Sequence, residues 1–280
     1  MTSEHYHFNI GDFECVSLSD GYKDYWPKSF FSNVSVETFE AALRQRGLPT
    51  DKIITPYTFL YVDTGNNRML VDIGAGKLAP STGKLLQSLQ GAGISPLDID
   101  TVIITHAHPD HIGGALDNDG QPIYANARYF IWKRDWDFWF SEDAASIAPE
   151  KHVAIARRNL EPLQGSIVLI EPGGDIVTGI STLPAPGHTP GHMVVSVTSA
   201  NDRLYFVSDT VLYPLHLEHP EWLPVFDILP EEAAASKRRI FDLVAEENAL
   251  VMAQHFPPFP SLGRVVKKGP GWLWQPIEKA

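Results

Sequence analysis

The chain of 280 residues has one cysteine, no long apolar run and fewer basic than acidic side chains. Cys15 alone cannot form an internal disulfide, and the alternating run DFECVSLSD predicts a buried strand position for it. No stretch approaches the roughly 18 consecutive apolar residues that a membrane span needs, and the first residues lack a basic region followed by an apolar one. We therefore expect a soluble, cytoplasmic protein that does not bind membranes.

The shortage of positive charge argues against a nucleic-acid partner. The chain has 22 Lys and Arg against 34 Asp and Glu, which gives a net charge of −12. Nucleic-acid binding uses clustered basic side chains, and the basic runs in this chain are short. The charge therefore argues against a nuclease and favours a small-molecule partner.

The pattern of apolar residues predicts a single α/β domain over residues 1–280, because strands alternate with helices and no repeat or linker is visible. Residues 5–19 suggest a pair of strands, and residues 58–73 suggest a hairpin with its turn at Gly65-Asn66-Asn67. Further strands are expected at 101–104, 122–131, 166–170, 193–198 and 203–207, and helices at 82–92, 132–140, 150–160 and 231–247.

Residues 20–57 differ from the rest because aromatic side chains lie close together among Pro, Ser and Asn. This composition predicts a segment that forms a lid over a site or a contact in a homodimer. Trp26 and Phe30, on this segment, are candidates for lining a substrate pocket.

The run HAHPDH at residues 106–111 carries three of the 11 histidines. After an extended segment, residues two apart point the same way, so His106 and His108 can converge on one metal ion. Pro109 and the glycines at 113 and 114 turn the chain, which lets Asp110 and His111 face a second point. This loop can therefore contribute to two metal sites.

Three more ligand candidates lie in loops next to apolar strands. His188 stands in GHTPGH before the expected strand 193–198, while Asp209 and His255 directly follow apolar runs. The carboxyl ends of strands are where α/β proteins tend to place their chemistry.

The other histidines carry weaker signals. We expect His5, His7, His152 and His219 to be surface or structural residues. His192 either caps its loop or faces the site, and His216 is a candidate for the substrate pocket. The aromatic run at 130–140 predicts core or a subunit contact rather than a cofactor site.

The order HAHPDH, GHTPGH, SDT and a late histidine resembles the metallo-β-lactamase fold family over residues 59–256. The resemblance implies a four-layer αββα sandwich. LVDIGAG at 70–76 resembles an earlier aspartate loop of the family, which implies that Asp72 supports the metal loop without binding a metal.

By the same resemblance, seven residues hold two divalent ions. His106, His108 and His188 hold the first ion, Asp110, His111 and His255 hold the second, and Asp209 bridges them. Zinc suits these nitrogen and oxygen ligands, although iron, manganese or cobalt would also be accepted. Two ions can share a hydroxide nucleophile, and Asp110 is a candidate catalytic proton donor to the leaving alkoxide.

Within the family, the segments LVDIGAG and HFPPFPSLG resemble the branch that holds N-acyl homoserine lactone lactonases and methyl parathion hydrolase. An acyl lactone is therefore the first substrate hypothesis, and an organophosphate triester or aryl ester is the alternative. A glyoxalase II-like thioesterase is less favoured because basic residues for an anionic thiol are not evident. A non-enzymatic alternative is a structural or sensory metal protein with a closed site.

Overall fold

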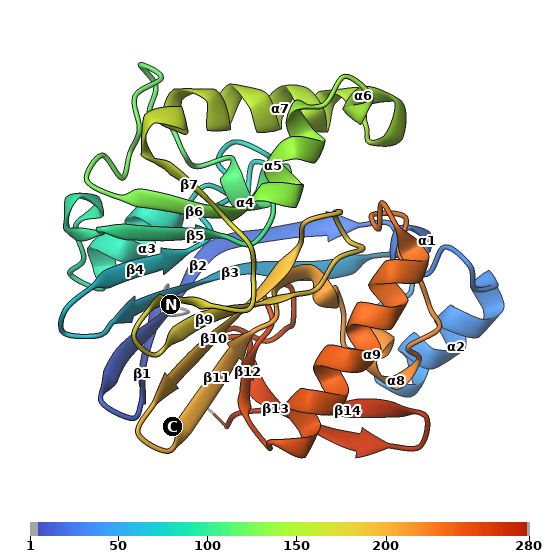
Figure 1. Cartoon of the computed structure of the whole chain (residues 1–280). Helices are drawn as coiled ribbons and strands as arrows, with labels where there is room; N and C mark the ends of the chain where they lie inside the picture. The colour runs from blue at the N-terminus through green and yellow to red at the C-terminus, as the bar shows by residue number, and fades with distance from the viewer. Residues whose placement is uncertain (1–4, 279–280) are drawn as a thin grey trace.

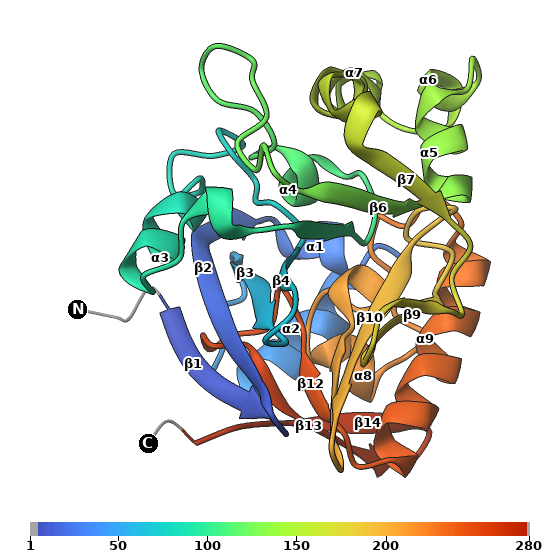
Figure 2. The ribbon, with the colours of Figure 1, turned by 60° about the vertical axis from the view of Figure 1, so that its left-hand side comes forward.

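The computed structural model describes residues 5–278, which fold as two seven-stranded β-sheets packed face to face with helices on both outer faces (Figure 1, Figure 2). This arrangement confirms the predicted four-layer αββα sandwich. Within the described residues, no helix is long and apolar enough to cross a membrane.

The first sheet contains the N-terminal strands in sequence order, and its last four strands run parallel. Its strands are β1 (His5–Ile10), β2 (Phe13–Tyr25), β3 (Ile53–Asp63), β4 (Arg68–Val71), β5 (Thr101–Ile104), β6 (Arg128–Trp132) and β7 (Ile167–Ile170). Parallel strands are connected through helices, so β4, β5 and β6 bring their carboxyl ends to one edge.

The second sheet contains the C-terminal strands, again in sequence order, with β11 and β12 parallel. Its strands are β8 (Asp175–Val177), β9 (Ile180–Pro184), β10 (Met193–Ser199), β11 (Asp202–Phe206), β12 (Leu250–Met252), β13 (Leu262–Lys268) and β14 (Gly271–Pro276).

Two sets of helices cover the outer faces. Leucine, alanine and aromatic side chains of α3 (Leu85–Gly91), α5 (Lys133–Phe140), α6 (Ala144–Ile147) and α7 (Glu150–Leu160) pack on the first sheet. The long helix α9 (Pro230–Glu246) packs on the second sheet through Ile240, Phe241 and Val244.

The contact between the two sheets forms a separate apolar core. Val62, Met69 and Ile103 from the first sheet meet Val195 and Phe206 from the second. Cys15 belongs to this core, as its alternating sequence predicted, and burial raises the pKa of its thiol to about 12. A dry interface of this kind fixes how the loops of the two sheets face each other.

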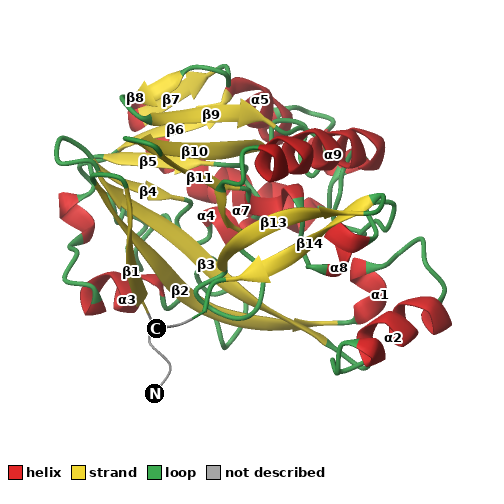
Figure 3. Ribbon diagram, turned by 90° about the horizontal axis from the view of Figure 1, so that it is seen from below, coloured by secondary structure: helices red, strands yellow, loops and turns green. Residues whose placement is uncertain are grey.

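Residues 20–57 contain α1 (Pro27–Phe30) and α2 (Val36–Gln45), which lie near α8 (Leu215–Glu218) in Figures 1 and 3. Phe31 and Leu43 of this segment pack on Leu215 and Trp222 in a small core of their own. The segment is therefore part of the folded domain. Its role as a lid or a dimer contact stays a prediction.

Candidate metal centre

Seven His and Asp side chains converge from four segments of the chain at one edge of the sandwich. In the first sheet, His106 and His108 follow β5, and Asp110 and His111 lie on the adjoining helix α4 (Pro109–Ile112). In the second sheet, His188 precedes β10, Asp209 follows β11 and His255 follows β12. The two sheets thus supply complementary parts of one site.

Close backbone packing explains why the loops are rich in glycine. A Cβ atom at Gly114 would lie 2.2 Å from the carbonyl oxygen of Ile73, and one at Gly191 would lie 2.1 Å from the backbone nitrogen of Asp135. Real atoms cannot approach so closely, so only glycine lets HPDHIGG and GHTPGH pack against their neighbours.

The first group is His106, His108 and His188, all buried. The Nδ1 atom of His108 lies 3.1 Å from Nε2 of His106 and 2.8 Å from Nε2 of His188. Three ring nitrogens that face one another in this way present their lone pairs to a single point, as a divalent ion requires.

The second group is Asp110, His111, Asp209 and His255. The Oδ2 atom of Asp110 lies 3.5 Å from Nε2 of His255 and 4.0 Å from Nε2 of His111. Asp110 is the most exposed member of the group, because 15% of its side chain is accessible.

The carboxylate of Asp209 spans the two groups. Its Oδ2 atom lies 3.1 Å from Nε2 of His188, while Oδ1 lies 3.4 Å from Nε2 of His111 and 3.3 Å from Nε2 of His255. Oδ1 is buried and has no hydrogen-bond partner among the described residues. A buried carboxylate oxygen without a donor fits a position that faces a metal ion.

Asp72 is hydrogen-bonded to the segment that carries His106, His108, Asp110 and His111. Its carboxylate accepts hydrogen bonds from the backbone N–H of Thr105 at 2.7 Å, from the Thr105 hydroxyl at 2.8 Å, and from Nδ1 of His111 at 2.8 Å. The residue has a φ of 60°, a left-handed conformation that non-glycine residues rarely adopt and that often marks functional sites. Asp72 belongs to neither ligand group, and its role as a support of the loop stays a prediction.

The outward nitrogens of three further histidines also have partners. His106 Nδ1 lies 3.1 Å from the Thr105 hydroxyl, and His255 Nδ1 lies 3.3 Å from the carbonyl oxygen of Pro56. His188 Nδ1 lies 2.9 Å from Oδ1 of Asp227. Such partners fix the orientation and tautomer of metal-binding histidines. The sequence analysis missed Asp227, because a lone aspartate in VFDIL carries no spacing signal.

Asp135 joins the two histidine loops and was also missed. Its Oδ2 accepts the N–H of Ala107 at 2.8 Å and of the Trp139 indole at 3.0 Å, while Oδ1 accepts the Thr189 hydroxyl at 2.5 Å and the Gly191 N–H at 3.3 Å. Its place in the first turn of α5 is an ordinary one for an aspartate, so the sequence gives no sign of this role.

His192 and His216 both have structural partners. Nε2 of His192 accepts the backbone N–H of Asp209 at 3.1 Å, so His192 holds the backbone of Asp209 and belongs to neither ligand group. His216 is buried behind Phe30, with its Nε2 2.7 Å from the Phe30 carbonyl oxygen, and it does not line the cavity described below.

Burial and neighbouring charges together set the pKa values of the histidines in the two groups. Burial holds the pKa of His106 and His108 well below the usual range, so both rings are neutral, as metal ligands must be. Burial opposes a charge on His188 as well, but Asp209 and Asp227 raise its pKa to about 9. Burial acts against a charged Asp209, yet His255, His111 and His188 hold the pKa of that carboxyl well below its usual range.

The donor set fits a pair of divalent ions. Imidazole nitrogen and carboxylate oxygen suit zinc and the other first-row metals, and the supported ring orientations leave the inner nitrogens free to bind. Among the described residues, clusters of this kind occur only in the two groups named above.

A cavity of about 430 Å³ opens over the site and reaches His108, Asp110, His188, Asp209 and His255. The lining includes the apolar side chains of Phe30, Leu212, Val225, Phe226 and Ile228. Trp26 is not among the lining residues, and 68% of it is exposed. Lys23, Lys151 and His152 form a basic part of the lining, although His152 was expected to be a surface or structural residue.

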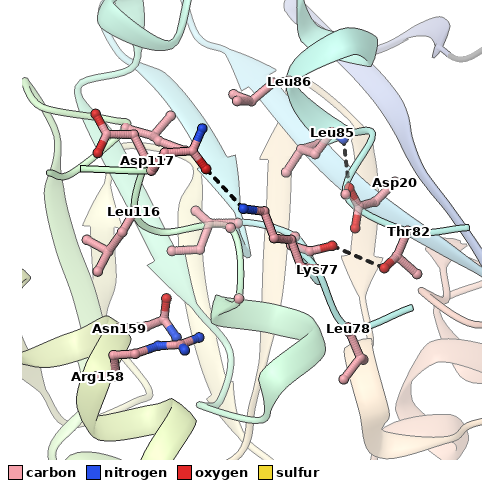
Figure 4. Close-up of a pocket in the computed structure, with 18 of the residues that line it drawn as sticks. Asp20, Lys77, Leu78, Thr82, Leu85, Leu86, Leu116, Asp117, Arg158 and Asn159 are labelled. Atoms are coloured by element: carbon pink, nitrogen blue, oxygen red, sulfur yellow. Dashed lines mark hydrogen bonds between the residues drawn. The ribbon is translucent and has the colours of Figure 1, made fainter. Parts of the chain in front are cut away.

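A second cavity, of about 880 Å³, lies on the other side of Leu78, which lines both cavities. Figure 4 shows Leu85, Leu86 and Leu116 around it, together with Lys77 and Arg158. This second cavity contains neither of the two metal-ligand groups.

The fold and the site together define the class. The sequence model of the metallo-β-lactamase superfamily matches residues 53–255, and the chain belongs to this superfamily. It has the fold of the metallo-β-lactamase hydrolases, with His and Asp groups suited to two divalent metal ions.

The similar solved structures include two that cover at least 99% of this chain. One is AidC, described as a dizinc quorum-quenching lactonase in complex with a product, N-hexanoyl-L-homoserine. It has a TM-score of 0.93 and 30% identity, covering 99% of both chains. The other is the hydrolase AbOPH, with a TM-score of 0.92 and 24% identity, covering 100% of this chain and 99% of the other. At this identity AbOPH shows the fold alone.

Curated relatives match over a shorter stretch. Metallo-beta-lactamase domain-containing protein 1 of Xenopus laevis is 26% identical over 68% of this chain, and an N-acyl homoserine lactonase of Bacillus cereus is 23% identical over 61%. The chain spans 66% and 62% of the lengths of these two relatives.

Proposed function

We propose that this protein is a binuclear metal-dependent lactonase that opens acyl lactones such as N-acyl homoserine lactones. The observation that carries the proposal is the position of Asp209, whose two carboxylate oxygens face the two histidine groups at the floor of a partly apolar cavity. The 30% identity with a dizinc lactonase over 99% of the chain supports the same assignment.

The residues would be divided between two ions, and zinc is the proposed metal. His106, His108 and His188 would hold one ion, with Asp110, His111 and His255 on the other and Asp209 shared. Two ions bound here would supply a water acidified to near-neutral pKa and a positive charge that polarises the ester carbonyl. Proton transfer and substrate binding would then depend on the side chains that line the cavity.

Asp110 is placed to give a proton to the leaving oxygen. Its carboxyl group lines the cavity and is partly accessible, whereas Asp209 is buried between the histidines. A positioned carboxylate of this kind can take the proton that the attacking water loses and pass it to the alkoxide that forms when the lactone C–O bond breaks.

The apolar part of the cavity lining suits an acyl chain. Phe30, Leu212, Val225, Phe226 and Ile228 lie on the cavity lining, and burial of each chain methylene against such a surface contributes about 0.8 kcal/mol. The open cavity also argues against a closed structural or sensory metal site, because small molecules can reach the ligand groups.

A second candidate function is thioester hydrolysis, and one observation favours it. The structure places Lys23 and Lys151 on the cavity lining, although the sequence analysis found no basic residues for an anionic thiol. Organophosphate triester or aryl ester hydrolysis stays the other alternative, since the same metal pair can act on a phosphoryl centre.

A side-by-side rate comparison tests these functions. Purified, zinc-loaded protein is assayed on N-acyl homoserine lactones, an aryl ester, methyl parathion and a glutathione thioester, with Asp209→Ala as the metal-site control. We expect the highest kcat/KM on the lactones and loss of all activities in Asp209→Ala. If the phosphate triester or the thioester wins by orders of magnitude, the lactone proposal is wrong.

A further inference from the structure

The hydroxyl groups of two tyrosines form a pair at the wall of the metal cavity. Tyr25 is the last residue of β2 and lines the cavity, whereas Tyr57 lies on the neighbouring strand β3 and is completely buried. The two hydroxyl oxygens are hydrogen-bonded to each other. Within residues 5–278, neither hydroxyl has another hydrogen-bond partner.

The burial of Tyr57 decides which hydroxyl is the donor. If Tyr25 donated to Tyr57, the hydrogen of the Tyr57 hydroxyl would be left without an acceptor in a dry environment, which is unfavourable. Tyr57 therefore donates to Tyr25. The hydrogen of Tyr25 is then free to be donated to a molecule in the cavity, and a donor behind it strengthens that bond.

Aromatic neighbours hold the Tyr25 ring in place. Phe30 and Phe226 contact it edge-on, with ring centroids 5.3 and 5.7 Å away, and Nζ of Lys23 lies 4.4 Å from the ring centre. Tyr57 is fixed in turn by an edge contact with the ring of His255, with centroids 4.9 Å apart. The ring of Tyr25, on the cavity lining, and the ring of Tyr57, beside the ligand candidate His255, are thus both held by aromatic contacts.

The charge around Tyr25 keeps its proton in place. Burial and the nearby Asp110 carboxylate both raise the pKa of the Tyr25 hydroxyl well above its usual range. Tyr25 can therefore donate a hydrogen bond without transferring the proton, and it lines the same cavity as Asp110.

We propose that Tyr25 donates a hydrogen bond to the leaving oxygen of the substrate and thereby selects oxygen esters and lactones over thioesters. The inference rests on the proposed hydrolytic function and narrows its substrate class. In the step itself a water oxygen bonds to the acyl carbon and the Asp110 carboxylate takes up the proton that the water loses. The C–O bond then breaks, the leaving oxygen keeps the bonding electrons, and Asp110 passes that proton to it. A thioester places a sulfur at this position, and sulfur is a weak hydrogen-bond acceptor.

The test is a ratio of two rates. The kcat/KM of a homoserine lactone is divided by that of the matching thiolactone, for the wild type and for Tyr25→Phe. The same ratio is measured with an oxygen ester and a thioester of one acid, so that lactones need not be the substrate. We expect Tyr25→Phe to lower both ratios roughly tenfold, because only the oxygen substrates lose a hydrogen bond.

Two further variants separate recognition from folding. The double variant Tyr25→Phe, Tyr57→Phe leaves no unpaired hydroxyl and should show the same fall. Tyr213→Phe is the matched control, because Tyr213 contacts Phe30 at a centroid distance of 6.0 Å but does not line the cavity. Its ratios should equal those of the wild type.

The outcomes distinguish the two proposals. If lactones are hydrolysed but the ratio is unchanged in Tyr25→Phe and in the double variant, the role of Tyr25 is wrong and the lactonase assignment stands. If lactones are inert and the ester to thioester ratio falls in Tyr25→Phe, the lactonase assignment is wrong and the role of Tyr25 stands.

Discussion

His188 and Asp227 form a buried pair in which Nδ1 of the imidazole lies 2.9 Å from the carboxylate, while Nε2 faces Asp209 at 3.1 Å. The aspartate holds the ring so that its other nitrogen points into the first metal group. Partners of this kind orient a metal ligand and increase its basicity.

Replacement of Asp227 by Ala is therefore expected to weaken metal binding by roughly 10- to 100-fold. The affinity is measured by competition with a chromophoric chelator. Asp242→Ala is the control, because Asp242 is exposed and pairs with Lys267 away from the site. Equal metal affinity in the two variants would contradict the role given to Asp227.

Loss of Asp135 should affect stability more than loss of any exposed acid. Asp135→Ala removes the acceptor of two backbone N–H groups, a hydroxyl and an indole. Because buried donors lose their partner, the free energy of unfolding should fall by about 3 kcal/mol. Urea unfolding of metal-free protein measures it.

Asp137→Ala is the matched control, since Asp137 lies on the same helix but is exposed and pairs with Lys133. Its free energy of unfolding should change by less than about 0.5 kcal/mol. A similar loss in both variants would show that Asp135 does not hold the two loops together.

Asp20 predicts a pH-dependent component of stability. Burial raises its pKa from 3.8 to about 6, against the opposing effect of hydrogen bonds that include the Ala75 and Leu85 N–H groups. Between these pH values the folded chain keeps a proton that the unfolded chain has lost, so this contribution to stability falls as pH rises.

The measurement is the difference in free energy of unfolding between the wild type and Asp20→Asn, at several values from pH 4 to pH 7. The wild type should lose stability relative to Asp20→Asn as pH rises through this range, since asparagine does not titrate. A difference that is independent of pH, or that moves the other way, would refute the prediction.

Phe30 and Trp26 were both candidates for the substrate pocket, and the structure separates them. Phe30 lines the cavity, whereas Trp26 is exposed outside it. We expect Phe30→Leu to raise KM for a long-chain lactone roughly tenfold, because contact with the acyl chain is lost. Trp26→Leu should leave KM within about twofold of the wild type by the same reasoning. Equal effects would mean that Trp26 folds over the substrate.

Much of the fold was predictable because local patterns agreed with the tertiary structure. The alternating residues 5–19 form β1 and β2, the hairpin 58–73 forms β3 and β4, and α5, α7 and α9 appear where helical spacing predicted them. The strand expected at 122–131 is confined to Arg128–Trp132, because residues 122–127 make only an isolated bridge at Pro122.

Strands without a clear local pattern, whose pairing depends on distant partners, were not predictable. The three-residue strand β8 has too few positions for a period, and β13 contains a Lys267-Lys268 pair that resembles a solvated surface run. They are strands because neighbours in the second sheet complete their hydrogen bonds.

The ligand candidates were visible in the sequence because metal binding demands particular side chains at close spacing, as in HAHPDH. Asp72 was named as a support through the resemblance, but Asp227 and Asp135 were not, because they act through contacts between segments far apart in the chain. A homodimer and a cytoplasmic location stay predictions.

The most direct test of the central claim counts the divalent ions held by each chain. Weakly bound metal is removed from zinc-loaded protein, and the remaining ion content is measured by mass spectrometry. Lactone hydrolysis is then followed while a chelator removes the ions and zinc is added back. Because two His and Asp groups share Asp209, we predict two ions per chain and hydrolysis that disappears and returns with them. Fewer than two ions per chain, or hydrolysis that survives their removal, would contradict the account.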